Sequence, residues 1–182
     1  MDCLTLFFFL IVSKKLDWDD ANTVFYVRAV YILSNVIIGV IYYMCYVKIQ
    51  AKNDLTILKY VDQPSPFSGE TEKPLVTTTV KDYDTQQLIS AVKGTGTGLL
   101  MMGVMHLGFH FTQPLLVQSV MPIKSTFDSK VVQVHLLNKP ATGDLKRPWK
   151  ATGMFGAAGP QPETDKASIK KAERETLGAK ED

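Results

Sequence analysis

The sequence predicts an all-α membrane protein with about three membrane helices, of which the first is short, a polar connecting loop and a largely irregular C-terminal tail. Two uncharged runs predict this class: residues 29–47 and residues 94–123 contain no acidic or basic side chain. At about 1.5 Å per residue, each run is long enough to cross a hydrocarbon core of about 30 Å. The charges of the 182-residue chain gather between and after these runs. This segregation excludes an ordinary water-soluble enzyme domain.

The first apolar run, residues 3–13, ends at Lys14 and Lys15 and is too short to cross a bilayer alone. It lacks the leading positive charge and the cleavage site of a secretory signal, so we expect it to be retained. If the two lysines snorkel and Trp18 lies at the interface, residues 3–18 form a short or tilted membrane helix. A re-entrant or surface-lying segment is the alternative.

The second predicted membrane helix covers residues 22–47, because Asp20 and Asn22 are good N-cap residues ahead of the apolar run. Residues 48–81 then form a polar loop outside the bilayer, rich in proline and charge. Residues 53–60 of this loop suit either an interfacial helix or a partly ordered loop. The β-branched residues 77–80 are too few to predict a strand.

The third predicted helix covers residues 84–121, capped by Asp82 or Asp84 and broken or kinked by Pro114 and Pro122. Residues 131–137 then suit a single strand or a lip packed on the membrane domain, which would comprise residues 1–137. Residues 138–182 form a polar, partly disordered tail, with a marginal helix from about residue 162 to residue 176.

Positive charge favours cytosolic flanks, and the densest basic cluster follows the third segment, which places the C-terminal tail in the cytosol. Three crossings put the N-terminus on the opposite side. If the first segment does not cross, the N-terminus is cytosolic too. The orientation of the N-terminus therefore stays open.

Polar side chains recur at helical spacing within both apolar helices, and they form the predicted site. On the second helix they follow one face from Arg28 to Tyr46, and on the third helix a similar row runs from Thr95 to Gln113. Either these groups anchor and bond the helices, or they line a watery groove that contacts client segments. The candidates for groove and client contact are Arg28, Asn35, Tyr42, Met102, Met105, His106, His110 and Gln113.

No catalytic or metal centre is expected. His106 and His110 share a helix face, but two histidines without nearby Cys or carboxylate ligands make a poor metal site. The sequence contains no nucleophile triad and no nucleotide fingerprint, so we predict neither enzymatic activity nor a cofactor. Ser90, Gly94 and Gly98 form a small-residue ridge that suits close helix packing.

The basic residues after the third segment are candidates for binding anionic lipid headgroups or ribosomal RNA, although a solvated juxtamembrane flank has the same composition. They are Lys139, Lys146, Arg147 and Lys150.

Four segments, residues 51–54, 80–84, 101–107 and 139–148, resemble the fungal SRP-independent targeting protein family, third component, long labelled an inorganic phosphate transport protein. The resemblance runs in order through nearly the whole chain. It implies a multi-pass endoplasmic reticulum membrane protein that helps deliver or insert membrane proteins without the signal recognition particle. It also implies partners: the Sec translocon, the ribosome, other SRP-independent targeting components, client membrane proteins and membrane lipids. Phosphate transport, or an accessory role in it, is the alternative function.

Overall fold

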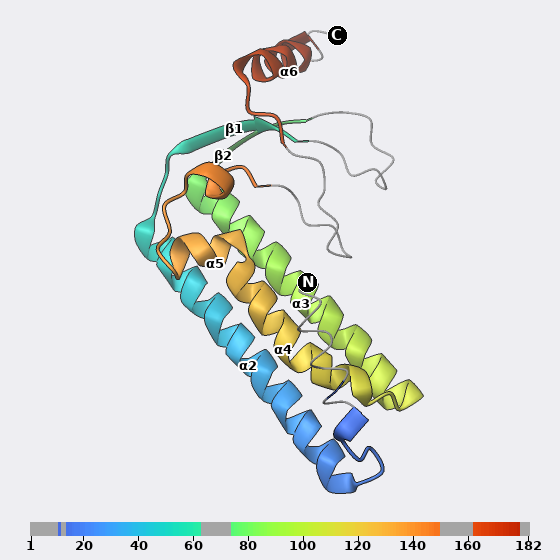
Figure 1. Ribbon diagram of the computed structural model, residues 1–182. Coiled ribbons are helices and arrows are strands. Elements are labelled where there is room, and N and C mark those ends of the chain that lie inside the picture. Colours follow the sequence, from blue (N-terminus) through green and yellow to red (C-terminus); the bar gives the residue numbers. More distant parts are fainter. Residues whose placement is uncertain (1–10, 12–13, 63–73, 150–161, 179–182) are drawn as a thin grey trace.

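Two long antiparallel helices, α2 and α3, and a shorter helix, α4, form the body of the protein (Figure 1). The computed structural model describes residues 11, 14–62, 74–149 and 162–178. Helix α2 covers Ala21–Lys52, α3 covers Val80–Phe109 and α4 covers Gln113–Asp128. Helix α4 runs back along α2 and packs mainly on it, and the short helix α5 (Lys130–His135) follows at the end where α2 finishes.

A small antiparallel sheet caps this same end, which we call the sheet end. Strand β1 (Ile57–Val61) pairs with β2 (Leu75–Thr79), with Ile57 opposite Thr79. The tail returns to the sheet, because Val61 forms an isolated bridge with Glu163 just before helix α6 (Lys166–Gly178). The other end of the bundle, where α2 begins and α3 finishes, is the far end.

Local chemistry explains where the long helices begin. The Asp20 carboxylate accepts hydrogen bonds from the Asn22 and Thr23 amides at the start of α2, as its N-cap role predicts. Thr79, and neither Asp82 nor Asp84, caps α3: its hydroxyl oxygen accepts from the Asp82 amide and its hydroxyl donates to the Asp82 carboxylate.

Helices α2 and α3 are each long and apolar enough to cross a membrane, judged by length and composition. The mostly helical fold and two of the predicted spans therefore agree with the sequence. The first predicted segment, residues 3–18, lies largely outside the described residues, so a third membrane helix stays a prediction.

Of the two options predicted for residues 84–121, a broken helix and a kinked one, the structure has the broken helix, because the chain reverses at residues 110–112. His110 adopts the left-handed conformation at the C-cap of α3, with a φ of 56°, and its amide donates to the Met105 carbonyl. Pro114 then lies in the first turn of α4. A proline there costs no hydrogen bond, since the first amides of a helix lack an internal acceptor. Pro114 therefore starts a new helix instead of kinking an old one.

This reversal changes the predicted threading. Helix α4 brings the chain back to the sheet end, so the polar connection between α2 and α3 and the C-terminal tail lie at the same end of the bundle (Figure 1). The single third helix would have left the tail at the end where α2 begins, whereas the structure places the start of the tail at the end where α2 finishes.

For two shorter segments the structure excludes one predicted option, the interfacial helix at residues 53–60 and the strand at residues 131–137, while the packed lip predicted as the other option for residues 131–137 fits. Residues 57–61 form strand β1 where an interfacial helix was an option, because residues 75–79 supply the partner that satisfies the backbone. Residues 130–135 form helix α5 where a strand was an option, because a helix buries Val131, Val132 and Val134 on the bundle. In both segments, contacts with residues far away in the sequence determined the secondary structure.

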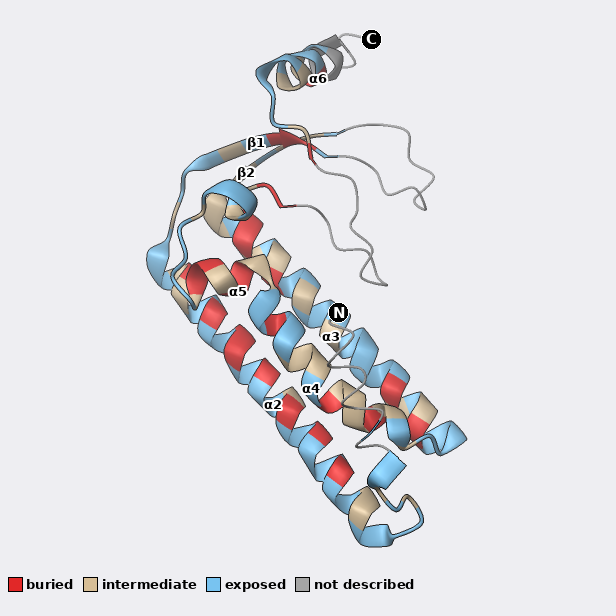
Figure 2. Cartoon of the chain, viewed as in Figure 1, coloured by how far each residue is buried: buried red, intermediate tan, exposed pale blue. Residues whose placement is uncertain are grey.

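The larger buried cluster lies toward the sheet end, where α5 and the first turns of α3 are buried, whereas the buried residues of α2 are spread along its length (Figure 2). One buried cluster there contains Ile38, Cys45, Ile49, Val132 and Trp149. A smaller cluster at the far end contains Val27, Tyr31, Met102 and Leu115. Most of the surface of α3 beyond its first turns stays exposed.

Candidate functional site

The predicted polar rows of α2 and α3 meet along one line, which we call the seam, where the two helices face each other. At the far end of the seam, the Arg28 Nε donates to His106 Nε2 across 2.9 Å. An acceptor nitrogen at Nε2 requires the neutral imidazole with its proton on Nδ1. That Nδ1 lies 3.1 Å from the Phe111 carbonyl oxygen, which accepts a hydrogen bond from it. His106 thus joins Arg28 to the reversal between α3 and α4.

Hydrogen bonds also occupy the middle of the seam. The Tyr42 hydroxyl lies 3.4 Å from the hydroxyls of both Thr95 on α3 and Thr126 on α4. The Asn35 amide donates to the Tyr31 carbonyl of its own helix. The polar rows therefore bond to one another and to backbone.

The predicted client-contact residues differ in accessibility. Met102 is 1% exposed and Tyr42 8% exposed, so neither can touch a client unless the helices separate. Asn35 and Met105 are half-buried, and His106 is buried. Arg28, His110 and Gln113 are exposed at the far end, where His110 ends α3 and Gln113 begins α4. The structure thus brings Arg28 and His106 together, but most of the remaining candidates lie apart from this pair.

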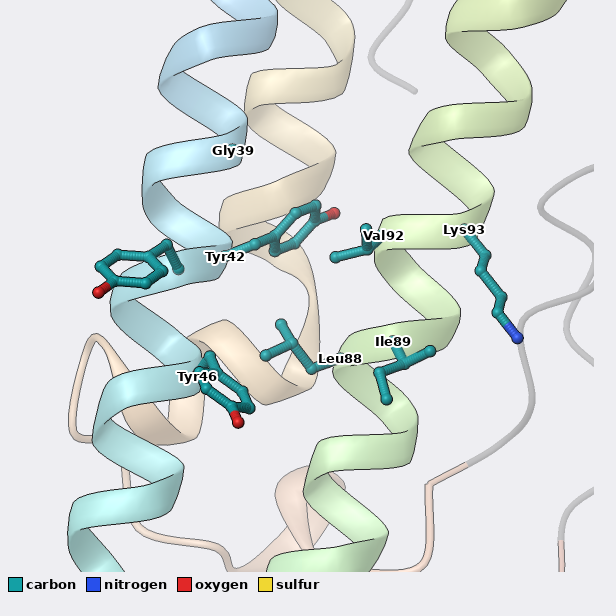
Figure 3. Close-up of a pocket in the computed structure, with 8 residues that line it drawn as sticks. Gly39, Tyr42, Tyr46, Leu88, Ile89, Val92 and Lys93 are labelled. Atoms are coloured by element: carbon teal, nitrogen blue, oxygen red, sulfur yellow. The ribbon is translucent and has the colours of Figure 1, made fainter.

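An apolar cleft of about 320 Å³ opens at the sheet-end part of the seam. Figure 3 shows Tyr42 and Val92 pointing toward each other across it, with Leu88 directed toward Tyr46. Its main walls are Gly39, Tyr42 and Tyr46 from α2, and Leu88, Ile89 and Val92 from α3. Sequence reasoning missed this cleft, because no single-helix pattern shows where two helices diverge.

The small-residue ridge of Ser90, Gly94 and Gly98 does not pack against another described helix. All three residues are exposed, and a Cβ added at Gly94 or Gly98 would meet nothing within 4 Å. Within the described part of the chain, the ridge lies open.

The predicted basic cluster divides into exposed and buried members. Lys139 and Lys146 are exposed, with Lys139 donating to the Gln133 side chain. Arg147 is instead bound to Asp84 by two hydrogen bonds of 2.6 Å, and its guanidinium lies 5.3 Å from the centre of the Trp149 ring. The guanidinium of Arg147 is therefore already paired within the protein, and Lys150 lies outside the described residues.

Asp84 is the centre of a buried network that sequence reasoning missed. It is fully buried, and the His135 Nε2 of α5 lies 2.6 Å from the same carboxylate that binds Arg147. The Trp149 amide donates to the Tyr83 hydroxyl beside it. We call Asp84, His135 and Arg147 the tail clamp. The signal in the sequence was only an acidic residue at a helix start, which suits a cap equally well.

Ionisable groups outside the helices have local partners. The Asp54 carboxylate accepts hydrogen bonds from the hydroxyl and the amide of Thr56, and these lower its pKa. Burial raises the pKa of Tyr60 in β1. Among the described residues, no group of three or more His, Cys, Asp or Glu side chains is placed to hold a metal ion.

These features define a small α-helical protein with two candidate membrane spans, a paired polar seam and a tail clamped to one end. A family model described as "Phosphate transport (Pho88)" matches residues 2–180, and the chain belongs to this family. The family resemblance drawn from the sequence motifs is thereby confirmed.

Two relatives match over nearly the whole chain. SRP-independent targeting protein 3 of Saccharomyces cerevisiae is 48% identical over 164 residues, which cover 90% of this chain and 87% of that protein. The SRP-independent targeting protein 3 homolog of Schizosaccharomyces pombe is 37% identical over 168 residues, covering 91% and 86%. No solved structure matches the chain significantly.

Proposed function

We propose that this protein acts in SRP-independent targeting of membrane proteins to the endoplasmic reticulum and assists their insertion without enzymatic chemistry. The observation that carries the targeting role is the 48% identity to a protein named for that role, over most of both chains. The insertion step is our inference from the membrane domain.

The seam between α2 and α3 is the proposed place of client contact. A client segment that crosses a bilayer needs polar groups to lower the cost of its hydrophilic part, and an apolar flank for its hydrophobic part. Arg28 and His106 supply polar groups within a candidate span. The exposed face of α3 supplies the flank, since Leu100 and Leu107 are 72% and 74% exposed.

The seam must open for this function, because its polar groups are bonded to one another. Helix α3 is the element that would move: beyond Leu88, its buried residues are Met102 and His106 alone among the residues described. Movement of α3 away from α2 and α4 would expose Tyr42, Asn35 and Met102 to a client. In our proposal, the predicted polar groove forms when the seam opens.

Charge supports a cytosolic sheet end. The polar connection and the tail both lie there, so their lysines act together in the positive-inside bias. The sheet-end residues include Lys48, Lys52, Lys59, Lys81, Lys139 and Lys146, against Lys14, Lys15 and Arg28 nearer the far end. With this orientation, Lys139 and Lys146 face the cytosol, the side on which ribosomes approach the Sec translocon. We propose the ribosome, the Sec translocon and the other SRP-independent targeting components as partners.

Photocrosslinking in the full-length protein tests client contact. A photoreactive amino acid at Met105 in the seam should capture a nascent membrane protein that is released without the signal recognition particle. The same group at exposed Lys170 of α6 is the control and should capture none. Equal capture at both positions, or none at Met105, would contradict the proposal.

A paired substitution tests the polar part of the seam. Arg28→Leu together with His106→Leu should impair client insertion by about tenfold if the pair stabilises a hydrophilic segment within the bilayer by about 1.4 kcal/mol or more. Folding is checked by thermal unfolding in detergent. Normal insertion by the folded double variant would remove this pair from the mechanism.

Phosphate transport is the second candidate, favoured by the description of the family model. A transporter needs an anion site near the middle of the bilayer, commonly between inverted repeats. Arg28 lies close to the start of α2 and already donates to His106. Phosphate uptake by vesicles containing the purified protein, with no client capture, would favour this candidate over insertion.

A further inference from the structure

The cleft at the sheet-end part of the seam has the shape and the chemistry of a lipid site. Its volume of about 320 Å³ lies at the lower limit of small-molecule pockets. Its walls are formed by aliphatic and aromatic side chains of two candidate membrane spans, and it opens sideways between them. Such a cleft in a bilayer is reached by acyl chains before any water-soluble ligand.

The ends of the two uncharged runs indicate where the cleft lies relative to the membrane surface. The run on α2 finishes at Val47, one residue after the cleft residue Tyr46, and the run on α3 begins directly after Lys93. The cleft therefore lies where the hydrocarbon core meets the headgroups at the sheet end. Tyrosine is favoured at this depth because its ring is apolar and its hydroxyl is polar.

Lys93 gives the cleft a charge preference. It borders the cleft, and Figure 3 shows its side chain on the side of α3 opposite Tyr42, extending toward the start of α3, which is the direction of the headgroups. No carboxylate among the residues that the structure describes pairs with its ammonium group. A charge at the membrane boundary is stabilised by an opposite charge, and the anion available to Lys93 there is a lipid phosphate or carboxylate.

We propose that this cleft binds one acyl chain of an anionic glycerophospholipid from the sheet-end leaflet, with Lys93 holding the headgroup. Tyr42 and Leu88 form the buried floor against which the chain packs, because they are 8% and 3% exposed. Gly39 leaves the wall open, since a Cβ at this position would meet nothing within 4 Å. This inference concerns a resident lipid and does not depend on the proposed insertion of clients.

Photoreactive lipids test the site in the full-length protein. The protein is reconstituted into phosphatidylcholine vesicles containing a little phosphatidylserine with a diazirine on its acyl chain, and labelled peptides are identified by mass spectrometry. Labelling should concentrate on residues 39–46 and 88–93. Even labelling of all lipid-exposed residues of α2 and α3 would overturn the proposal, because it would indicate ordinary surrounding lipid.

Two glycine variants separate the cleft from the rest of the helix surface. Gly39→Leu should fill the cleft and reduce this labelling by about tenfold, as expected when added methylenes occupy an apolar pocket. Gly96→Leu is the matched control, because the space around Gly96 is equally open but lies outside the cleft. Equal labelling of the two folded variants would contradict the assignment.

The charge of Lys93 is tested with two lipid probes. Lys93→Gln should reduce the preference for labelled phosphatidylserine over labelled phosphatidylcholine by about fivefold, while Lys52→Gln, beyond the cleft, leaves it unchanged. Equal labelling by the two probes in the unmodified protein would refute a headgroup role for Lys93.

Discussion

The two ends of the bundle are built differently. At the sheet end, the tail clamp ties α3, α5 and the tail together over a cluster that contains Ile38, Cys45 and Val132. At the far end, the Arg28–His106 pair and four buried apolar side chains hold the helices. The sheet end is therefore suited to fix the tail to the membrane domain, and the far end is suited to let α3 move.

The largest expected effect is loss of the clamp. Arg147→Leu removes the guanidinium from the fully buried Asp84 carboxylate and leaves it with the His135 imidazole as its side-chain partner, which should cost about 3–5 kcal/mol in the free energy of unfolding. Thermal unfolding in detergent measures the loss. Arg174→Leu on the exposed face of α6 is the control and should change stability little. Similar stabilities for the two variants would show that the tail clamp does not stabilise the sheet end.

A smaller effect is expected from the corresponding change at the far end. Arg28→Leu leaves the buried His106 Nε2 without its donor, at a cost of about 1–3 kcal/mol. Adding His106→Leu should recover most of this loss, because replacing both partners leaves no unpaired polar group. Thermal unfolding of Arg28→Leu and of the double variant in detergent tests both expectations. A cost as large as that of Arg147→Leu would remove the difference between the ends.

The smallest effect concerns the cap of α2. Backbone hydrogen bonds from Asn22 and Thr23 lower the pKa of Asp20, so its stabilisation is present above the unfolded pKa of about 3.9 and is lost as the pH falls through the folded pKa. Asp20→Asn keeps a capping oxygen and should preserve stability at neutral pH, while removing this acid-dependent loss. Unfolding measured from pH 7 to pH 3 tests it. An unchanged acid profile in Asp20→Asn would assign the loss to other carboxylates.

Sequence reasoning succeeded where the signal was local and long. The two uncharged runs predicted α2 and α3, the Asp20 cap predicted the start of α2, and Asp165 preceded the predicted tail helix. It failed where the outcome depended on a partner far away in the chain. Strand β1 needed β2, and Asp84 needed Arg147, which is 63 residues away.

The candidate site divides in the same way. Helical spacing aligned Thr95 and His106 on the face of α3 that meets α2, because the period of a helix determines which side chains align, but it also assigned Gln113 to this row, which the structure places on α4. The spacing of residues on one helix does not show which side chains of the other helix lie opposite them. The Arg28–His106 bond, the Tyr42–Thr95 contact and the apolar cleft all required the relative placement of α2 and α3.

By itself, the sequence determined that this chain carries two apolar helices with polar rows, and it identified the family. Tertiary structure alone decided that α4 turns back, that the loop and the tail share one end, and that Arg147 pairs with the Asp84 carboxylate. The physical reason is the separation along the sequence over which each interaction acts. Apolar runs and helix caps act within a few turns of one helix, whereas chain reversal and buried charge pairing depend on which distant segments pack together.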